Sequence, residues 1–369
     1  MGNWLSDHAR DPETVLCMKG IPSKLPRGWE VSEEWDSSNM REGEQKNSET
    51  CKVMIPVVRC PSTFKPNKLI AKQSMVEVEA YAKMKMAFKK HGMDMSTVPE
   101  LAQPVCLSKH IVVLPWYHMS LSDAMERKDP SVPNINTIMR LGQDMVRAVV
   151  ALGRCGIVHT DIAPPNICLW RRHGEVHAVM IDFETNIDIR RMGNQHWKSI
   201  QSPRPRFSSL RRHARYRGTW TTAPYIDVAD ALEECGWVLT WCICCMIGQP
   251  FVTAHHMVYD TAYYKECAKR AEHLGQRAAI HAKEAETEKE KRVAHEKMLR
   301  GECPFKGWPA SVASTMCRYF TIVENIPRRD DKRTTTFNMT STDVNAILKV
   351  LQYRVVEGEA EEIKMKHST

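Results

Sequence analysis

Three features of secreted and membrane proteins are missing from this chain of 369 residues. No cationic and apolar leader stands at the N-terminus, and the 13 cysteines form no repeated CxxC pairs. We therefore expect reduced cysteines in an intracellular, cytoplasmic protein rather than a disulfide framework. The longest apolar run, residues 235–248, is too short to cross a bilayer, so we expect a buried helix there.

Acidic residues are missing from residues 190–217, within a chain whose formal net charge is +8. This stretch contains nine Lys or Arg residues and no Asp or Glu. Such a basic segment attracts anions, so an acidic or phosphorylated protein is the expected partner, and no stable nucleic acid complex is expected. A solvated loop is the alternative interpretation.

The order of predicted elements gives a small strand-rich part followed by a larger helical part. Residues 1–50 are polar and are expected to be largely poorly ordered. Residues 51–118 contain strand-like runs such as "KVMIPVVRC" around the helix-forming "LIAKQSMVEVEAYAKMKMAFKK". Residues 119–355 are mainly helical and include a long solvated helix at 264–300, and residues 356–369 form a tail.

One stretch of residues 156–170, "GIVHTDIAPPNICLW", places His, Asp and Asn at close spacing. A helix predicted from Ile138 onward leads into it. The hairpin predicted from "NICLW" and "EVHAVMIDF" then carries Asn166 at its start and Asp182 at its end. Because a hairpin folds its ends together, we expect these two side chains to lie close.

Asp161, Asn166 and Asp182 have the side chains that phosphoryl transfer requires. This reaction needs Mg²⁺ held by hard oxygen ligands and an acceptor hydroxyl oriented by a carboxylate. Asn166 and Asp182 suit the metal, and Asp161 suits the hydroxyl. The alternative is that Asp161 and Asn166 cap a turn while Asp182 closes a strand. The flanking helix, hairpin and basic loop favour the phosphoryl-transfer site.

These residues, with His159 and "IDFE", resemble the catalytic loop and the metal-binding motif of the protein-kinase superfamily. Downstream, "GTWTTAP" resembles the end of a kinase activation segment, and "ALEECGWVL" resembles a helix of casein-kinase-like and fungal kinase-like proteins. The resemblance covers residues 53–351. It implies an α+β, two-lobed fold with an N-lobe at 51–118, a C-lobe at 119–355 and a basic activation segment at 182–224. It also implies ATP and Mg²⁺ as cofactors.

The residues that grip the nucleotide depart from the family pattern. No GxG motif precedes the first predicted strands. The strand lysine of the family falls best on Arg59, because Glu77 lies eighteen positions later on the following helix. Lys72, five residues before Glu77, is assigned to that helix. The resemblance implies Arg59, Glu77 and Trp116 as the nucleotide-binding residues.

The catalytic loop also departs from the family pattern. Ala163 and Pro165 stand where serine/threonine and tyrosine kinases place a Lys and an Arg, so neither acceptor class is indicated. Glu184 replaces the Gly of the metal motif. Ala231 replaces the buried Asp of the "DLES" helix, although Asp230 is adjacent.

Three functions fit these observations. The favoured one is a divergent protein kinase that transfers the γ-phosphate of ATP to a protein hydroxyl. The second is a pseudokinase that acts as a binding scaffold, which the missing glycine loop and Arg59 favour. The third is a small-molecule kinase of the aminoglycoside or choline type, but those enzymes lack an activation segment such as the one that ends in "GTWTTAP".

The first residues, "MGNWLS", match the pattern for N-terminal myristoylation at Gly2, with Ser6 at the required position. A single acyl chain gives only marginal membrane affinity, so any membrane association is expected to be weak and reversible. Nuclear and membrane-associated locations are therefore kept as alternatives to the cytoplasm.

Overall fold

The computed structural model combines helices with antiparallel sheets, as expected for the α+β class. It forms two compact units, which are described separately below: Met1–His118 with Met180–Asn186, and Met119–Val179 with Ile187–Thr369. The residues that the structure describes are 14–15, 24–25, 29–31, 54–59, 69–108, 110–115, 117, 119–185, 187–188, 207–210, 226–249, 251, 289–305, 307–327 and 339–352.

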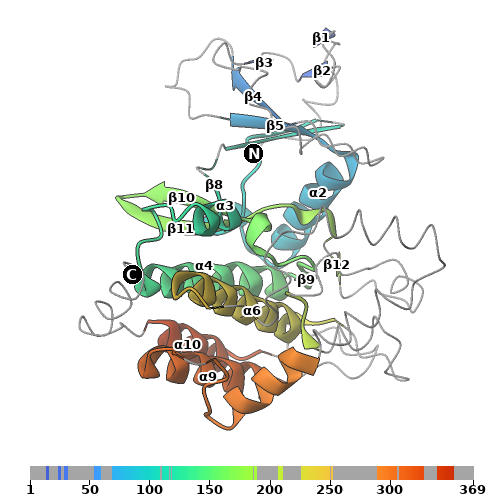
Figure 1. The fold of residues 1–369 in the computed structure, drawn as a ribbon. Helices are drawn as coiled ribbons and strands as arrows, with labels where there is room; N and C mark the ends of the chain where they lie inside the picture. Colours follow the sequence, from blue (N-terminus) through green and yellow to red (C-terminus); the bar gives the residue numbers. More distant parts are fainter. Residues whose placement is uncertain are drawn as a thin grey trace, which may run out of the picture. The chain divides into compact units, whose positions relative to one another are not determined.

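A five-stranded antiparallel sheet forms much of the first unit (Figure 1). Its order is β3-β4-β5-β7-β6, and β7 is buried along Ile111 to Leu114, as its run of apolar residues predicts. The strands are β3 (Trp29–Val31), β4 (Met54–Arg59), β5 (Leu69–Gln73), β6 (Cys106–Leu107) and β7 (Ile111–Pro115).

A separate pair of short strands, β1 (Thr14–Val15) and β2 (Lys24–Leu25), also belongs to the first unit. With β3, these strands lie in residues 1–50, which the sequence analysis expected to be largely poorly ordered. That segment therefore contributes strands, and its other residues lie outside the part of the chain that the structure describes.

Helix α2 (Met75–Lys90) begins after Ser74, whose Oγ accepts a hydrogen bond from the backbone N–H of Glu77 at 3.1 Å. The predicted helix began six residues too early, at Leu69, and the prediction was wrong for Leu69–Gln73. Those residues form strand β5, because β4 and β7 pair with it on both sides. Lys72 is therefore a strand residue.

A later segment of the chain, Met180–Asn186, returns to the first unit. The backbone of Met180 donates to Glu100 O at 2.8 Å and accepts from Ala102 N at 3.0 Å. The short helix η4 (Phe183–Thr185) follows, and the Phe183 ring packs edge-on against Tyr81 of α2 with ring centroids 5.3 Å apart. The predicted division of the chain placed this segment in the second part.

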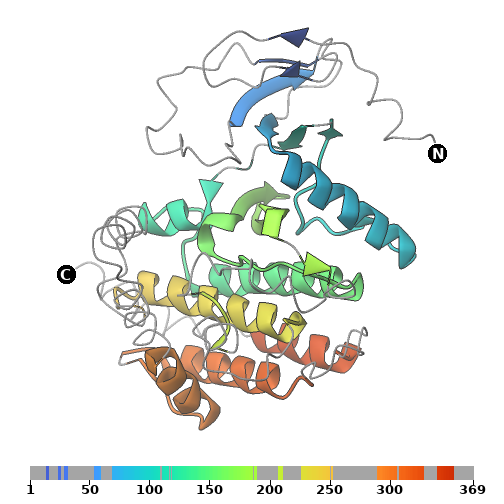
Figure 2. The same cartoon turned by 90° about the vertical axis from the view of Figure 1, so that its right-hand side faces the viewer.

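Helix α6 (Val228–Met246) is the centre of the second unit, and nearly all of its residues are buried. It packs between α4 and α9 (Figures 1 and 2). The prediction of a buried helix for the longest apolar run is thus confirmed, and no described helix is long and apolar enough to span a bilayer. The other labelled helices are α3 (Leu121–Glu126), α4 (Ile135–Arg154), α9 (Ala310–Glu324) and α10 (Ser341–Leu351).

The predicted hairpin is present as β10 (Ile167–Arg172) and β11 (Glu175–Met180). Its two-residue turn places His173 at φ 50° and Gly174 at φ 81°, the left-handed backbone that a tight hairpin requires. Strand β8 (Met119–Ser120) extends this sheet, while β9 (Ile157–Val158) pairs with β12 (Ile187–Asp188). The first strand of the hairpin continues directly from the short helix η3 (Pro164–Asn166).

Only the last part of the predicted solvated helix at 264–300 lies among the described residues. Residues 289–299 are helical, but one face is buried. The ammonium of Lys291 donates to the carbonyl of Ser208 and lies 4.7 Å from the Trp237 ring centroid. This part is therefore packed on the second unit rather than solvated on all sides.

We expect Gly236→Ala to destabilise the second unit, because the new Cβ would lie 2.8 Å from both Phe320 Cζ and Tyr319 Cε1. Overpacking of this kind costs about 1–3 kcal/mol of unfolding free energy. Urea unfolding measures the loss. Ser314→Ala, at an exposed position of α9, is the control and should change stability by less than about 0.5 kcal/mol. Equal stabilities of the two variants would contradict the close packing of α6 on α9.

Candidate functional site

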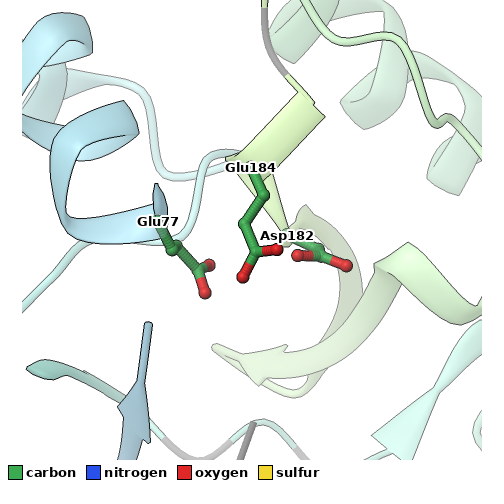
Figure 3. Close-up of side chains that lie close together, drawn as sticks. All are labelled: Glu77, Asp182 and Glu184. Atoms are coloured by element: carbon green, nitrogen blue, oxygen red, sulfur yellow. The ribbon is translucent and has the colours of Figure 1, made fainter. Parts of the chain in front are cut away.

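In the first unit, the ammonium of Lys72 lies among three carboxylates. Its Nζ forms an ion pair with Glu77 Oε2 and lies 3.1 Å from Asp182 Oδ1 and 3.5 Å from Glu184 Oε1. Lys72 comes from β5 and Glu77 from the first turn of α2, whereas Asp182 follows Lys72 by 110 residues. Figure 3 shows the three carboxylates close together, with Glu184 on η4. We call these four residues the Lys72 cluster.

Ser74 connects the helix start to the cluster. Its hydroxyl accepts from the Glu77 backbone and donates to Glu184 Oε1 at 2.8 Å. The same side chain therefore caps α2 and orients Glu184. Lys72 and Glu77 lie on the two sides of this strand-to-helix junction, in β5 and α2.

Asp182 has a backbone φ of 63°, in the left-handed region. Among residues other than glycine, Asp and Asn adopt this region most readily, at a cost of about 1–2 kcal/mol. The pairing of Met180 before it and the packing of Phe183 after it hold the backbone in place. Strain of this kind concentrates at functional sites, which marks Asp182 as a functional candidate.

The carboxylates outweigh the single ammonium. Burial lowers the pKa of Lys72, but the nearby carboxylates of Glu77, Asp182 and Glu184 raise it by more. The net shift of the pKa is therefore upward, and the ammonium stays charged. Burial raises the pKa of Glu77, which Lys72 opposes and Asp182 reinforces. With all four groups ionised, the Lys72 cluster carries a charge of about −2, which favours a bound cation.

Glu77 Oε1 is buried and has no hydrogen-bond partner within the described part of the chain. An unsatisfied buried acceptor is unfavourable, since its contacts with water are lost without replacement. The side chains of Asp182 and Glu184 retain 24% and 12% of their surface exposed, so the Lys72 cluster is open to solvent on their side. A small ligand from the solvent can therefore reach the carboxylates of Asp182 and Glu184, which lie next to Glu77.

A second group of predicted residues lies in the second unit. Asn166 Nδ2 donates to Asp161 Oδ2 at 2.7 Å and to the Asp161 carbonyl at 2.9 Å. The Asp161 N–H donates to His159 Nδ1 at 3.2 Å. All three side chains are buried. The loop thus holds the Asp161 carboxylate in one orientation.

Both hydrogen bonds of the Asn166 amide use its nitrogen, and both acceptors are oxygens, so the assignment of the two amide atoms is unambiguous. Its Oδ1 makes no hydrogen bond to the residues that the structure describes. Asn166 can therefore offer a hard oxygen ligand while it orients Asp161.

The predicted site residues are distributed over the two units. Asp161 and Asn166 are brought together, but Asp182 belongs to the first unit, so the shared Asn166 and Asp182 metal site stays a prediction. Arg59 is the last residue of β4, and its side chain lies outside the described part, as does Trp116. The predicted pairing of Arg59 with Glu77 therefore stays untested, whereas Lys72 contacts Glu77 directly.

Sequence reasoning missed Lys72, Ser74 and Glu184 as members of a site. One signal was present: "SMVE" at residues 74–77 matches the S-x-x-E pattern of a helix start. Had the helix been started there, Lys72 would have fallen on the preceding strand. No local signal joins Glu184 to Lys72, because their contact depends on the fold.

Three acidic residues of α6 hold a short segment of the second unit in place. Asp230 is buried and accepts a hydrogen bond from Ser209 Oγ at 2.9 Å, while Glu233 accepts from Leu210 N at 2.7 Å. Glu234 accepts from Ser209 N at 3.2 Å. Residues 207–210 are thereby fixed to α6.

Other predictions fall on residues that the structure does not describe. These include Gly2, "GTWTTAP" and the basic segment at 190–217, of which only 207–210 are described. They remain predictions.

A comparison with models of known protein families found no match, and a search of curated proteins found no similar sequence.

We expect Ser74→Ala to lower the unfolding free energy by about 1 kcal/mol, because α2 loses its N-cap. Glu184 also loses its hydroxyl donor in this variant. Chemical denaturation measures the change, and Ser74→Thr, which keeps a hydroxyl, is the matched control. If Ser74→Ala is as stable as Ser74→Thr, the hydroxyl does not support this junction.

Proposed function

We propose that the chain is a divergent protein kinase that transfers the γ-phosphate of ATP to a protein hydroxyl. The observation that carries the proposal is the contact of Lys72 with both Glu77 and Asp182. In protein kinases, a lysine on the third strand pairs with a helix glutamate, and a nearby aspartate holds Mg²⁺. Lys72 likewise lies on the third strand, in chain order, of its five-stranded sheet. The kinase-like two-lobed arrangement is part of the same proposal.

The residues present fit ATP and Mg²⁺. Lys72 supplies the compact positive charge that suits phosphate, a role that the sequence analysis gave to Arg59. Asp182 and Asn166 would hold Mg²⁺, since a carboxylate and a free amide oxygen are hard ligands. When bound, the ion would neutralise part of the phosphate charge.

Asp161 would act on the acceptor. Its carboxylate orients the protein hydroxyl and takes its proton, while the oxygen forms a bond to the γ-phosphorus and the bond to ADP breaks. Asn166 Nδ2 holds that carboxylate at 2.7 Å, which limits its rotation. Asn166 is thus also a positioning residue for Asp161.

One structural feature supports a protein as the phosphate acceptor. Residues 207–210 lie within the predicted activation segment and are fixed to α6 by three buried carboxylates. A fixed segment beside the predicted basic residues offers a surface for an acidic or phosphorylated protein. Small-molecule kinases of the aminoglycoside or choline type lack such a segment.

A pseudokinase scaffold is the second candidate, and Glu184 favours it. Its carboxylate lies 3.5 Å from Lys72 Nζ, where it competes with phosphate for the ammonium. A pseudokinase would transfer no phosphate, whether its affinity for the nucleotide is retained or reduced.

We expect Asp161→Asn to reduce phosphate transfer by about 100-fold or more, because the proton acceptor is lost. ATP affinity should change little, so the loss appears in turnover. Transfer from labelled ATP to generic acidic and basic protein acceptors provides the measurement. The control is Asp94→Asn, an exposed N-cap where Asn caps equally well. Undiminished transfer in Asp161→Asn would refute the role of Asp161.

A second pair of variants separates Lys72 from Arg59. Lys72→Met should weaken binding of ATP with Mg²⁺ by at least about tenfold, since it removes a charge-assisted contact worth about 1.5–3 kcal/mol. Arg59→Met should leave the affinity unchanged. Calorimetric titration measures both. The reverse ranking would restore the sequence-based assignment to Arg59.

A further inference from the structure

We propose that Glu77, Asp182 and Glu184 bind a hard divalent cation, such as Mg²⁺ or Mn²⁺, in the absence of nucleotide. This carboxylate site goes beyond the proposed kinase metal site, because Glu77 and Glu184 have no role in that site. It also requires neither ATP nor phosphate transfer.

The geometry of the three oxygens suits such an ion. Each residue offers one carboxylate oxygen, and these oxygens all lie within 4.8 Å of one another. Ligands of one octahedral ion at about 2.1 Å stand roughly 3–4 Å apart, and those of a larger ion stand further apart. Small side-chain rotations would therefore bring the three oxygens to one ion, with water completing its shell.

A second and independent observation is the orphaned acceptor of Glu77. Glu77 is fully buried, and its Oε1 has no hydrogen-bond donor among the described residues. A cation shared with Asp182 and Glu184 would supply the missing interaction. Three carboxylates select hard ions, because softer metals prefer sulfur and imidazole ligands, which are not part of this set.

Glu184 is prepared for this role. Ser74 Oγ donates to Glu184 Oε1 and so limits the rotation of its carboxylate. Asp182 is held by its left-handed backbone between the Met180 pairing and the Phe183 ring. The carboxylate site therefore draws on a fixed strand-to-helix junction and on a fixed returning segment.

Lys72 competes with the ion for the same oxygens. Its ammonium contacts all three carboxylates, but it sits on a flexible four-carbon chain and can move. Metal entry would release it from Asp182 and Glu184. If the proposed kinase function also holds, this release frees Lys72 for a phosphate group, so metal binding precedes tight nucleotide binding.

The test is a titration of the full chain with Mn²⁺ without nucleotide, in which free Mn²⁺ is followed by electron paramagnetic resonance. We expect one ion per chain, and about tenfold or more weaker binding in Glu184→Gln. Glu79→Gln, an exposed position on the same helix, is the matched control and should bind as the wild type does. Absence of a bound ion, or equal binding by Glu184→Gln, overturns the proposal.

Two further variants distinguish this site from the kinase metal site. Asn166→Ala should retain Mn²⁺ binding without nucleotide, because Asn166 is not a ligand here. Lys72→Met should bind Mn²⁺ more tightly and show a larger thermal shift with it, since the competing ammonium is gone. Loss of binding in Asn166→Ala with retention in Glu184→Gln would assign the ion to the kinase site instead. An Asp161→Asn enzyme that loses transfer but still binds Mn²⁺ would leave both proposals standing.

Discussion

The buried ammonium of Lys72 is the constraint on which the first unit depends. A buried charge is tolerated only when opposite charges surround it, so the chain must deliver carboxylates to that point. Glu77 arrives from the adjacent helix start, whereas Asp182 and Glu184 arrive from a segment 110 residues away. The sheet, α2 and the returning segment are thereby tied to one another by charge as well as by packing.

This constraint explains why Met180–Asn186 belongs to the first unit although its neighbours in sequence belong to the second. Three kinds of interaction hold this segment: the backbone pairing of Met180, the ion pairs of the Lys72 cluster, and the ring contact of Phe183 with Tyr81. The chain passes from one unit to the other on both sides of this short segment. Any change at Asp182 therefore acts on the fold of the first unit.

Local patterns predicted those elements whose cause is local. Helix α4, the β10 and β11 hairpin and the buried helix α6 follow from periodicity, turn residues and apolar runs, and the structure has all of them. The start of α2 was misplaced because "LIAKQ" also has helix-forming composition, and pairing with β4 and β7 overrides that preference. The misplaced helix start left Lys72 out of the predicted strand, so the prediction of a nucleotide-binding residue fell on Arg59.

The candidate site was predictable only within single stretches. Asp161 and Asn166 are five residues apart, and their hydrogen bonds close a loop that the sequence already marked. The meeting of Lys72 with Asp182 and Glu184 depends on the whole first unit, and the sequence contains no periodic signal for it. Glu184 was recognised as a departure from the family pattern, but its contact with Lys72 could not be inferred from that departure.

The burial of α6 has a chemical consequence for its cysteines. Burial raises the pKa values of the Cys235, Cys242 and Cys244 thiols well above the usual range for cysteine. Since the thiolate is the reactive form, these thiols are inert towards alkylating and oxidising reagents while the helix stays packed. The thiols of this central helix therefore become reactive only when the second unit opens, so the rate at which they are labelled measures that opening.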